Sequence, residues 1–484
     1  MSETTEAKPE AKSPVEFQPL NWWQAVLLVF GAAVCFHAAY TSANPGPLAL
    51  FIVGYVVCVV QLARLRTTRQ SFYTALLTGL LCYGPQLGFF WRIFGPAAIA
   101  LWAILALWLA LFAALSHVAL VRLGVKRAVW LIPFLWTGLE YFRSELYYLK
   151  FSWLNVGFAF AQVEWVPFQM LGVYGIDFFI VVYAALYFVI SGKRIFIWSL
   201  IVVLLSAFAL PFLAIAHMGN SAQRPQIVGV QLEFPNDSQI NRALDNAVAA
   251  RAQVDLIVLS EYTLDGEPTE QLKNWCRENR KFLIVGGKEP AQGNNFYNTA
   301  FVIGTDGEVV FKQAKSVPIQ FFKDGLPAPE QKLWESPWGK IGICICYDLS
   351  YARVTDELVR QGAQMLVVPT MDVAEWGQHQ HELHARIAPV RAAEYGIPIF
   401  RLASSGISQG VNKSGWVQSS APFPGQGEMI FFGANLNRKG SLPLDRYLAP
   451  FSVTVTGAFA GWLLIAGRKK NAAPTQITMP PSPC

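Results

Sequence analysis

The chain has 484 residues and a formal net charge of +6 at pH 7; 53% of its residues are hydrophobic and 14% are charged. This balance is too apolar for an ordinary soluble protein and indicates a membrane protein long enough for more than one domain. The small positive charge comes largely from the loops between apolar segments, so it does not indicate a nucleic-acid partner.

Residues 1–21 are polar and contain Glu, Lys and Pro, which predicts a disordered cytoplasmic tail and not a cleaved signal peptide. Apolar segments that are each able to cross a hydrocarbon core of about 30 Å follow this tail. We expect about seven spans in an N-terminal helical domain of residues 22–217 and one C-terminal span. The expected spans cover residues 22–40, 46–63, 71–91, 95–121, 128–142, 169–191, 195–217 and 450–467.

Lys and Arg concentrate in the loops that lie on one side of the membrane when the N-terminus is cytoplasmic. The short loops of the other side hold only Arg92, Arg143 and Lys150. The positive-inside rule therefore places the polar block of residues 218–449 on the outer face. It places residues 468–484, which follow the last span, in the cytoplasm as a second tail.

The outer block alternates apolar, strand-like runs with amphipathic segments, a pattern typical of α/β folds. One hairpin is expected over Thr305, Asp306 and Gly307, and Ser238 is the expected cap of the first helix. The expected strands cover residues 226–232, 254–260, 282–287, 296–303, 309–312, 340–346, 365–369 and 398–403. The expected helices cover residues 238–251, 269–280, 352–361 and 381–395.

Two of these strands end in side chains capable of chemistry. Residues 254–260 lead into Glu261, and the run that starts at Lys340 leads into Cys346. A thiolate is a strong nucleophile, and a cysteine at the exit of a buried strand is held rigidly while it still faces a cleft. A structural role is the alternative, because Cys344 and Cys346 alternate as two small apolar residues on one strand face would.

Two other motifs favour structural roles. The Gly-Ile-Ser-Gln-Gly sequence at residues 406–410 has the spacing of a serine nucleophile elbow, but no helix is expected after it. Side chains of the types that bind metal ions cluster near the start of one expected helix. They lack the spacing that places two metal ligands one helical turn apart. These side chains are His379, His381, Glu382 and His384. The seven cysteines also show no disulfide or zinc spacing, so we expect neither a metal nor a cofactor.

The order of Glu261, Lys315 and Cys346 along the chain resembles the Glu-Lys-Cys triad of the nitrilase, or carbon-nitrogen hydrolase, superfamily. Further motifs resemble the bacterial apolipoprotein N-acyltransferase family; they lie at residues 151–157, 172–177, 372–377, 391–394 and 401–406. The resemblance covers nearly the whole chain. It implies an αββα sandwich between the membrane helices, in a protein of the bacterial inner membrane whose catalytic domain lies in the periplasm.

The resemblance also implies a role for each triad residue. Glu261 would be the general base, Cys346 the nucleophile, and Lys315 the cation that stabilises the tetrahedral oxyanion. The backbone N–H of Tyr347 is the expected second oxyanion donor.

The chain departs from the family pattern around the lysine. Gln313 stands at the family's lysine position, with a lysine on either side of it. We prefer Lys315 because it shares the strand parity of Gln313, and Lys312 is the alternative. The family's loop Glu is absent, so Asp324 is its expected substitute, and Asp348 stands where the family has a second Glu.

The activity implied by the resemblance is acyl transfer in two steps, without a cofactor and by a monomer. Cys346 would take an acyl chain from a membrane phospholipid and pass it to the α-amino group of the N-terminal diacylglyceryl-cysteine of a lipoprotein. Two alternatives remain open. One is a membrane-tethered, nitrilase-like amidase that hydrolyses a small amide, and the other is a catalytically silent scaffold that binds lipoproteins.

Overall fold

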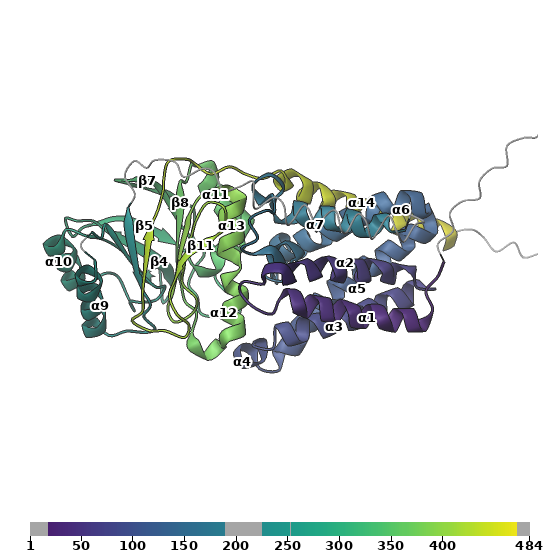
Figure 1. Cartoon of the computed structure of the whole chain (residues 1–484), viewed down its shortest axis with the longest axis horizontal. Helices are drawn as coiled ribbons and strands as arrows, with labels where there is room; N and C mark the ends of the chain where they lie inside the picture. The colour runs from purple at the N-terminus through teal and green to yellow at the C-terminus, as the bar shows by residue number, and fades with distance from the viewer. Residues whose placement is uncertain (1–17, 189–224, 252, 472–484) are drawn as a thin grey trace, which may run out of the picture.

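The computed structural model describes residues 18–188, 225–251 and 253–471. Figure 1 shows a helical part at one end of the molecule and a part that contains all the labelled strands at the other. The expected span at residues 195–217 lies outside the described residues, as do residues 1–17 and 472–484 of the two expected tails.

Eight α-helices of the described residues, joined by short 3-10 and π-helical turns, make up the helical part. They are α1 (Trp22–Ala39), α2 (Phe51–Gln61), α3 (Thr68–Gln86), α4 (Phe90–Phe94), α5 (Ala97–Leu123), α6 (Val125–Tyr141), α7 (Phe168–Leu186) and α14 (Asp445–Asn471). On α1 the side chains of Leu27 and Phe30 are exposed, as side chains that contact lipid are. Trp22 and Trp23 begin the same helix, where an interfacial aromatic belt would lie.

Several helices are long and apolar enough to cross a membrane. Among the described residues these segments are Trp22–Ala39, Gly46–Arg64, Ala97–Leu123, Phe168–Leu186 and Asp445–Ala466. Helices α3 and α6 occupy two more expected spans and pack against α5. Helix α6 has only 17 residues, and α3 contains several polar ones. The exact number of spans stays a prediction.

Some boundaries differ from the expected ones. The expected span at 71–91 is divided, because α3 ends soon after Pro85 and the short helix α4 follows as a separate element. Helix α14 begins at Asp445, five residues before the expected C-terminal span, and it continues to Asn471 inside the expected tail. Pro450 lies in the second turn of α14, so the helix starts before the first residue of the expected span.

The α/β part contains two six-stranded sheets. The first has the order β12-β1-β2-β3-β4-β5 and the second the order β11-β10-β9-β8-β7-β6. In each sheet three parallel strands are flanked by antiparallel ones. The strands of the first sheet are β1 (Gln226–Val230), β2 (Leu256–Leu259), β3 (Phe282–Pro290), β4 (Phe296–Ile303), β5 (Val309–Ala314) and β12 (Met429–Gly433). Those of the second are β6 (Leu333–Ser336), β7 (Gly339–Ile343), β8 (Met365–Thr370), β9 (Ile399–Ala403), β10 (Gln409–Val411) and β11 (Val417–Ser420).

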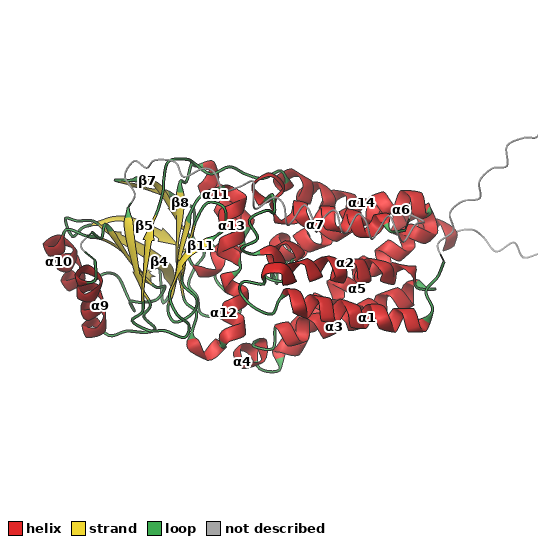
Figure 2. Ribbon diagram, viewed as in Figure 1, coloured by secondary structure: helices red, strands yellow, loops and turns green. Residues whose placement is uncertain are grey.

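The two sheets pack face to face and are covered by helices on their outer sides. Apolar side chains of both sheets, such as Val258 and Val367, form the core between them. Helices α9 (Asp237–Ala249) and α10 (Glu270–Asn279) pack on the first sheet. The second sheet carries α11 (Ala352–Arg360), α12 (Gln378–Ala385) and α13 (Ile387–Tyr395), on the side of the helical part (Figure 2). The nitrilase-like sandwich is therefore present, and its second helix layer adjoins the membrane helices.

Two local expectations about helices were wrong. Helix α9 is capped by Asn236 and not by Ser238, because the Asn236 side chain accepts a hydrogen bond from the N–H of Gln239 in a capping box. The expected helix at 381–395 is two helices, α12 and α13. Pro389 has no N–H to donate to the carbonyl of residue 385, so the helical hydrogen-bond ladder is interrupted there.

Candidate active site

The structure brings Glu261, Lys315 and Cys346 together. Glu261 lies just after β2, Lys315 directly follows β5, and Cys346 comes three residues after the end of β7. All three side chains are buried, and all three line one cavity of about 470 Å³. Parallel strands of the two sheets therefore deliver a carboxylate and a thiol to the same place, and a lysine joins them from the end of an antiparallel strand.

Lys315 is held between two carboxylates. Its Nζ lies 2.9 Å from Glu261 Oε1 and 2.8 Å from Asp324 Oδ2. Asn298 Nδ2 donates to Glu261 Oε1 at 2.6 Å and to Asp324 Oδ1 at 3.0 Å. One cation and one amide thus connect the two acids, and the lysine cannot rotate away without leaving a buried charge unpaired.

Burial and the neighbouring charges have opposite effects on the pKa values of Glu261, Lys315 and Asp324. Burial raises the pKa of the Glu261 carboxyl above its usual range, although the neighbouring ammonium of Lys315 acts in the opposite direction. Burial also opposes the charge of Lys315, but Glu261 and Asp324 outweigh it and hold the pKa of this lysine well above its usual range. Burial likewise opposes ionisation of Asp324, yet Lys315 holds the pKa of that carboxyl below its usual range. The two carboxylates therefore favour the protonated form of Lys315.

Lys312, the alternative lysine, lies at the surface and not in the site. The side chain of Lys312 is 55% exposed and pairs with Glu289, whereas that of Lys315 is 1% exposed. Gln313 is buried like Lys315, as their shared parity predicts. Only Lys315 of these two lysines reaches Glu261 in the structure.

Cys346 occupies a sharp turn. Its φ is +52°, a conformation that costs a non-glycine residue free energy and is common where a side chain is aimed at a functional site. Its Sγ lies 3.8 Å from the carbonyl oxygen of Met371, to which it donates. The N–H of Met371 donates to Glu261 Oε2 at 2.7 Å. Burial raises the pKa of the Cys346 thiol well above its usual range, and the Glu261 charge adds to this effect, so the thiol needs a base to react.

Asp348 and Tyr347 have other surroundings. The Asp348 carboxylate accepts hydrogen bonds from the N–H groups of Ile345, Ser316 and Val317, which ties the cysteine turn to the lysine segment. Burial raises the pKa of Asp348 to about 6. The Tyr347 hydroxyl donates to the carbonyl of Lys150 at 2.9 Å, across the boundary with the helical part. The oxyanion role of the Tyr347 N–H stays a prediction.

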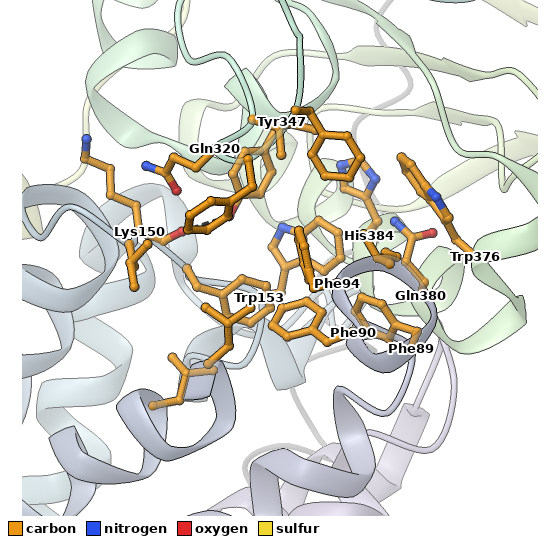
Figure 3. A pocket seen from close by; sticks show the side chains of 18 of the residues that line it. Phe89, Phe90, Phe94, Lys150, Trp153, Gln320, Tyr347, Trp376, Gln380 and His384 are labelled. Atoms are coloured by element: carbon orange, nitrogen blue, oxygen red, sulfur yellow. Dashed lines mark hydrogen bonds between the residues drawn. The ribbon is translucent and has the colours of Figure 1, made fainter. Parts of the chain in front are cut away.

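A second, apolar cavity of about 120 Å³ reaches Cys346 from the side of the helical part. Figure 3 shows aromatic side chains of two segments lining it, Phe89, Phe90 and Phe94 from the region of α4 and Trp153 from the loop before α7. Ile319, Phe322 and Trp376 line both cavities. Cys346 therefore lies where a cavity suited to an apolar chain meets a cavity that holds a carboxylate and an ammonium group.

The two motifs interpreted as structural have hydrogen-bonding roles. Ser408 Oγ donates to Gln231 Oε1 at 2.5 Å and accepts from the N–H of Ala403 at 2.9 Å, and the element after it is β10. On α12, His384 Nδ1 lies 2.8 Å from Asp372 Oδ1. Within the described ranges, no group of three or more His, Cys, Asp or Glu side chains could hold a metal ion.

Several contacts of the site were not predicted from the sequence. Asn298 lies in the middle of β4, and both polar groups of the Met371 backbone face the site. Asp372 appeared only as part of a resembling motif, yet its carboxylate contacts His384 and Arg401. A polar residue inside an otherwise apolar strand was the available signal for Asn298.

Comparisons with known proteins cover most of the chain. Residues 32–186 match the apolipoprotein N-acyltransferase N-terminal domain, and residues 230–421 match the carbon-nitrogen hydrolase family. An apolipoprotein N-acyltransferase of Geobacter metallireducens is 23% identical over 90% of this chain and 94% of its own length. One of Shewanella oneidensis is 24% identical over 79% and 86%. A crystal structure of a Helicobacter pylori carbon-nitrogen hydrolase is 16% identical over 44% of this chain and 90% of its own, with a TM-score of 0.40.

Proposed function

The chain belongs to the apolipoprotein N-acyltransferase family of carbon-nitrogen hydrolases, and we propose that Cys346 carries an acyl group from a membrane phospholipid to the α-amino group of a lipoprotein's N-terminal diacylglyceryl-cysteine. The observation that carries the proposal is the position of Cys346. Its thiol lies between an apolar cavity on the side of the helical part and a second cavity into which Glu261 and Lys315 bring a carboxylate and an ammonium group. An acyl chain and a reacting carbonyl need these two environments side by side.

In the first step the thiol attacks the lipid ester. Glu261 takes the proton of Cys346, and the thiolate forms a bond to the ester carbonyl carbon. Lys315 and the N–H of Tyr347 stabilise the oxyanion of the tetrahedral intermediate. The C–O bond of the ester then breaks, and Glu261 returns the proton to the leaving oxygen. The products are a thioester on Cys346 and a lysophospholipid.

In the second step the neutral α-amine attacks the thioester carbonyl. Glu261 takes one proton from the attacking nitrogen, and Lys315 again faces the oxyanion. The C–S bond breaks, and Glu261 gives the proton back to the sulfur. The enzyme returns to its starting state and the acceptor carries an amide, so the reaction follows a ping-pong order.

Asp324 and Asp348 support this chemistry without entering it. Asp324 shares Lys315 with Glu261, which keeps the lysine charged and fixed in place, and it takes the place of the loop Glu of the family. Asp348 binds three N–H groups and keeps the cysteine turn against the segment of Lys315. We assign both to positioning the reacting groups.

The protein is membrane-associated, with several apolar helices able to span a bilayer. We propose that it lies in the bacterial inner membrane as a monomer, with the sandwich in the periplasm. The one-sided distribution of Lys and Arg in the loops supports this orientation, and lipid substrates place the chemistry at a bilayer surface. A tag inserted in the exposed turn at residues 292–295 should then be accessible to antibody in spheroplasts, and a reporter fused after residue 470 should be cytoplasmic. A tag that becomes accessible only after lysis would overturn this topology.

The test of the function is a product assay. Purified protein in detergent is incubated with phospholipid and a synthetic diacylglyceryl-cysteinyl peptide, and the peptide is analysed by mass spectrometry. We expect an N-acylated peptide and an equal amount of lysophospholipid. Ammonia release from small amides without transfer to the peptide would favour the amidase instead. Peptide binding without either reaction would favour the scaffold.

A further inference from the structure

The Asp372 carboxylate orients two polar side chains of α12, and His381 Nδ1 of the same helix lies 3.8 Å from its Oδ2. Asp372 Oδ1 lies 2.8 Å from His384 Nδ1 and accepts from Gln380 Nε2 at 3.3 Å. Asp372 is fully buried, and Arg401 beside it compensates its charge. Each of the two side chains of α12 therefore turns a nitrogen toward Asp372 and turns its other polar atom away.

The tautomer of His384 follows from these contacts. Nδ1 lies 2.8 Å from a carboxylate oxygen, which only accepts, and 2.9 Å from Arg401 Nη2, which only donates. We assign the ring proton to Nδ1, because Arg401 Nη2 already donates to Asp372. Burial lowers the pKa of His384, which favours the neutral ring. The ring is also stacked on Trp153, with centroids 4.6 Å apart and planes 13° apart. Nε2 is consequently a lone-pair acceptor in a fixed direction.

His384 Nε2 and Gln380 Oε1 have no hydrogen-bond partner in the part of the chain that the structure describes. Both residues are 2% exposed, and both line the apolar cavity that contains Cys346. Figure 3 shows the two side chains beside Trp376 and the aromatic residues of the cavity. Buried polar atoms are normally paired, so two acceptors left free in an apolar cavity point to a ligand that donates hydrogen bonds.

We propose that His384 and Gln380 form a binding site for a primary amine of a substrate. The inference rests on the proposed function and extends it to the recognition of one group. An acyl chain and an ester carbonyl have no N–H or O–H, so they cannot satisfy these acceptors. A primary amine has at least two N–H donors, one for each acceptor. Two substrates carry such a group: the α-amino group of the acceptor and the head group of an aminated phospholipid.

The test separates the two half-reactions in variants of the full-length protein. His384→Asn keeps an amide donor for Asp372 and removes the acceptor at Nε2, and Gln380→Met removes the other acceptor. His379→Asn is the matched control, because His379 is on the same helix, bonds to Gln86 and lines neither cavity. Acyl-enzyme is formed with phosphatidylglycerol, which has no amine, or with phosphatidylethanolamine. It is then mixed with the diacylglyceryl-cysteinyl peptide.

We expect either variant to slow an amine-dependent step by about 10- to 100-fold, as the loss of one hydrogen bond to a polar or charged group does. Acylation by phosphatidylglycerol should stay within about threefold of wild type. Slow transfer to the peptide identifies the α-amino group as the ligand, and slow acylation by phosphatidylethanolamine alone identifies the head group.

Two results would overturn the inference. One is that acylation by phosphatidylglycerol slows as much as the amine-dependent steps, which would mean that the cluster has a purely structural role. The other is that the variants react at wild-type rates with both phospholipids and with the peptide. If His384→Asn does not fold, Gln380→Met decides alone, since it leaves the His384–Asp372 contact in place. A wild-type protein that forms no thioester would instead reject the proposed function.

Discussion

Cys346→Ala should abolish acyl-enzyme formation and lower acyl transfer on the order of 10⁶-fold, since the nucleophile of a covalent mechanism has no substitute. Cys344→Ala should keep most of the activity. Cys346 lines both cavities, whereas Cys344 lines neither and packs in the core on the helical side of the second sheet. Intact mass after incubation with phospholipid measures the adduct directly in each variant.

The two cysteine variants control for each other, because each removes one buried thiol from the same segment. Circular dichroism should show that both are folded. Retention of the adduct in Cys346→Ala, or equal loss in both folded variants, would contradict the assignment of the nucleophile.

Lys315→Met should slow acylation by about 10²–10³, the usual effect of removing a preorganised oxyanion donor. It should also lower the free energy of unfolding by about 3–5 kcal/mol, because Glu261 and Asp324 are left buried without their cation. Single-turnover rates should therefore be measured below the melting temperature of the variant.

Lys312→Met is the matched control for the lysine. Lys312 is exposed and pairs with Glu289 at the surface, so we expect a rate within about threefold of wild type and a change of no more than about 0.5 kcal/mol in stability. Acylation by Lys315→Met within about threefold of wild type would reject Lys315 as the oxyanion cation. A large loss in Lys312→Met would transfer the role to that residue.

The parts of the site that could be predicted are those set by local pattern. Glu261 and Cys346 each end an apolar run, and buried parallel strands place such residues at one edge of the sandwich. Gln313 and Lys315 are two residues apart in an extended segment, so their side chains face the same side. This spacing correctly favoured Lys315, which is buried, over Lys312. The alternation of strand and helix patterns likewise predicted the α/β class and the hairpin of β4 and β5.

The parts that could not be predicted depend on contacts between distant segments. Asn298 and the Met371 backbone reach Glu261 from 37 and 110 residues away. Cys344 and Cys346 were thought to share a strand face if structural, but β7 ends at Ile343 and the positive φ of Cys346 turns it away. Strands β6, β10, β11 and β12 lie outside the expected strands, and their pairing with neighbours in the two sheets defines them.

The most direct test of the account is a pulse-chase measurement of the intact protein. Wild-type protein is incubated briefly with phospholipid, the lipid is removed, and the diacylglyceryl-cysteinyl peptide is added while intact mass and peptide mapping are followed. We expect one acyl adduct on Cys346 that disappears at the rate at which N-acylated peptide appears. An N-acylated peptide formed without any adduct on Cys346, or an adduct that the peptide does not remove, would contradict it.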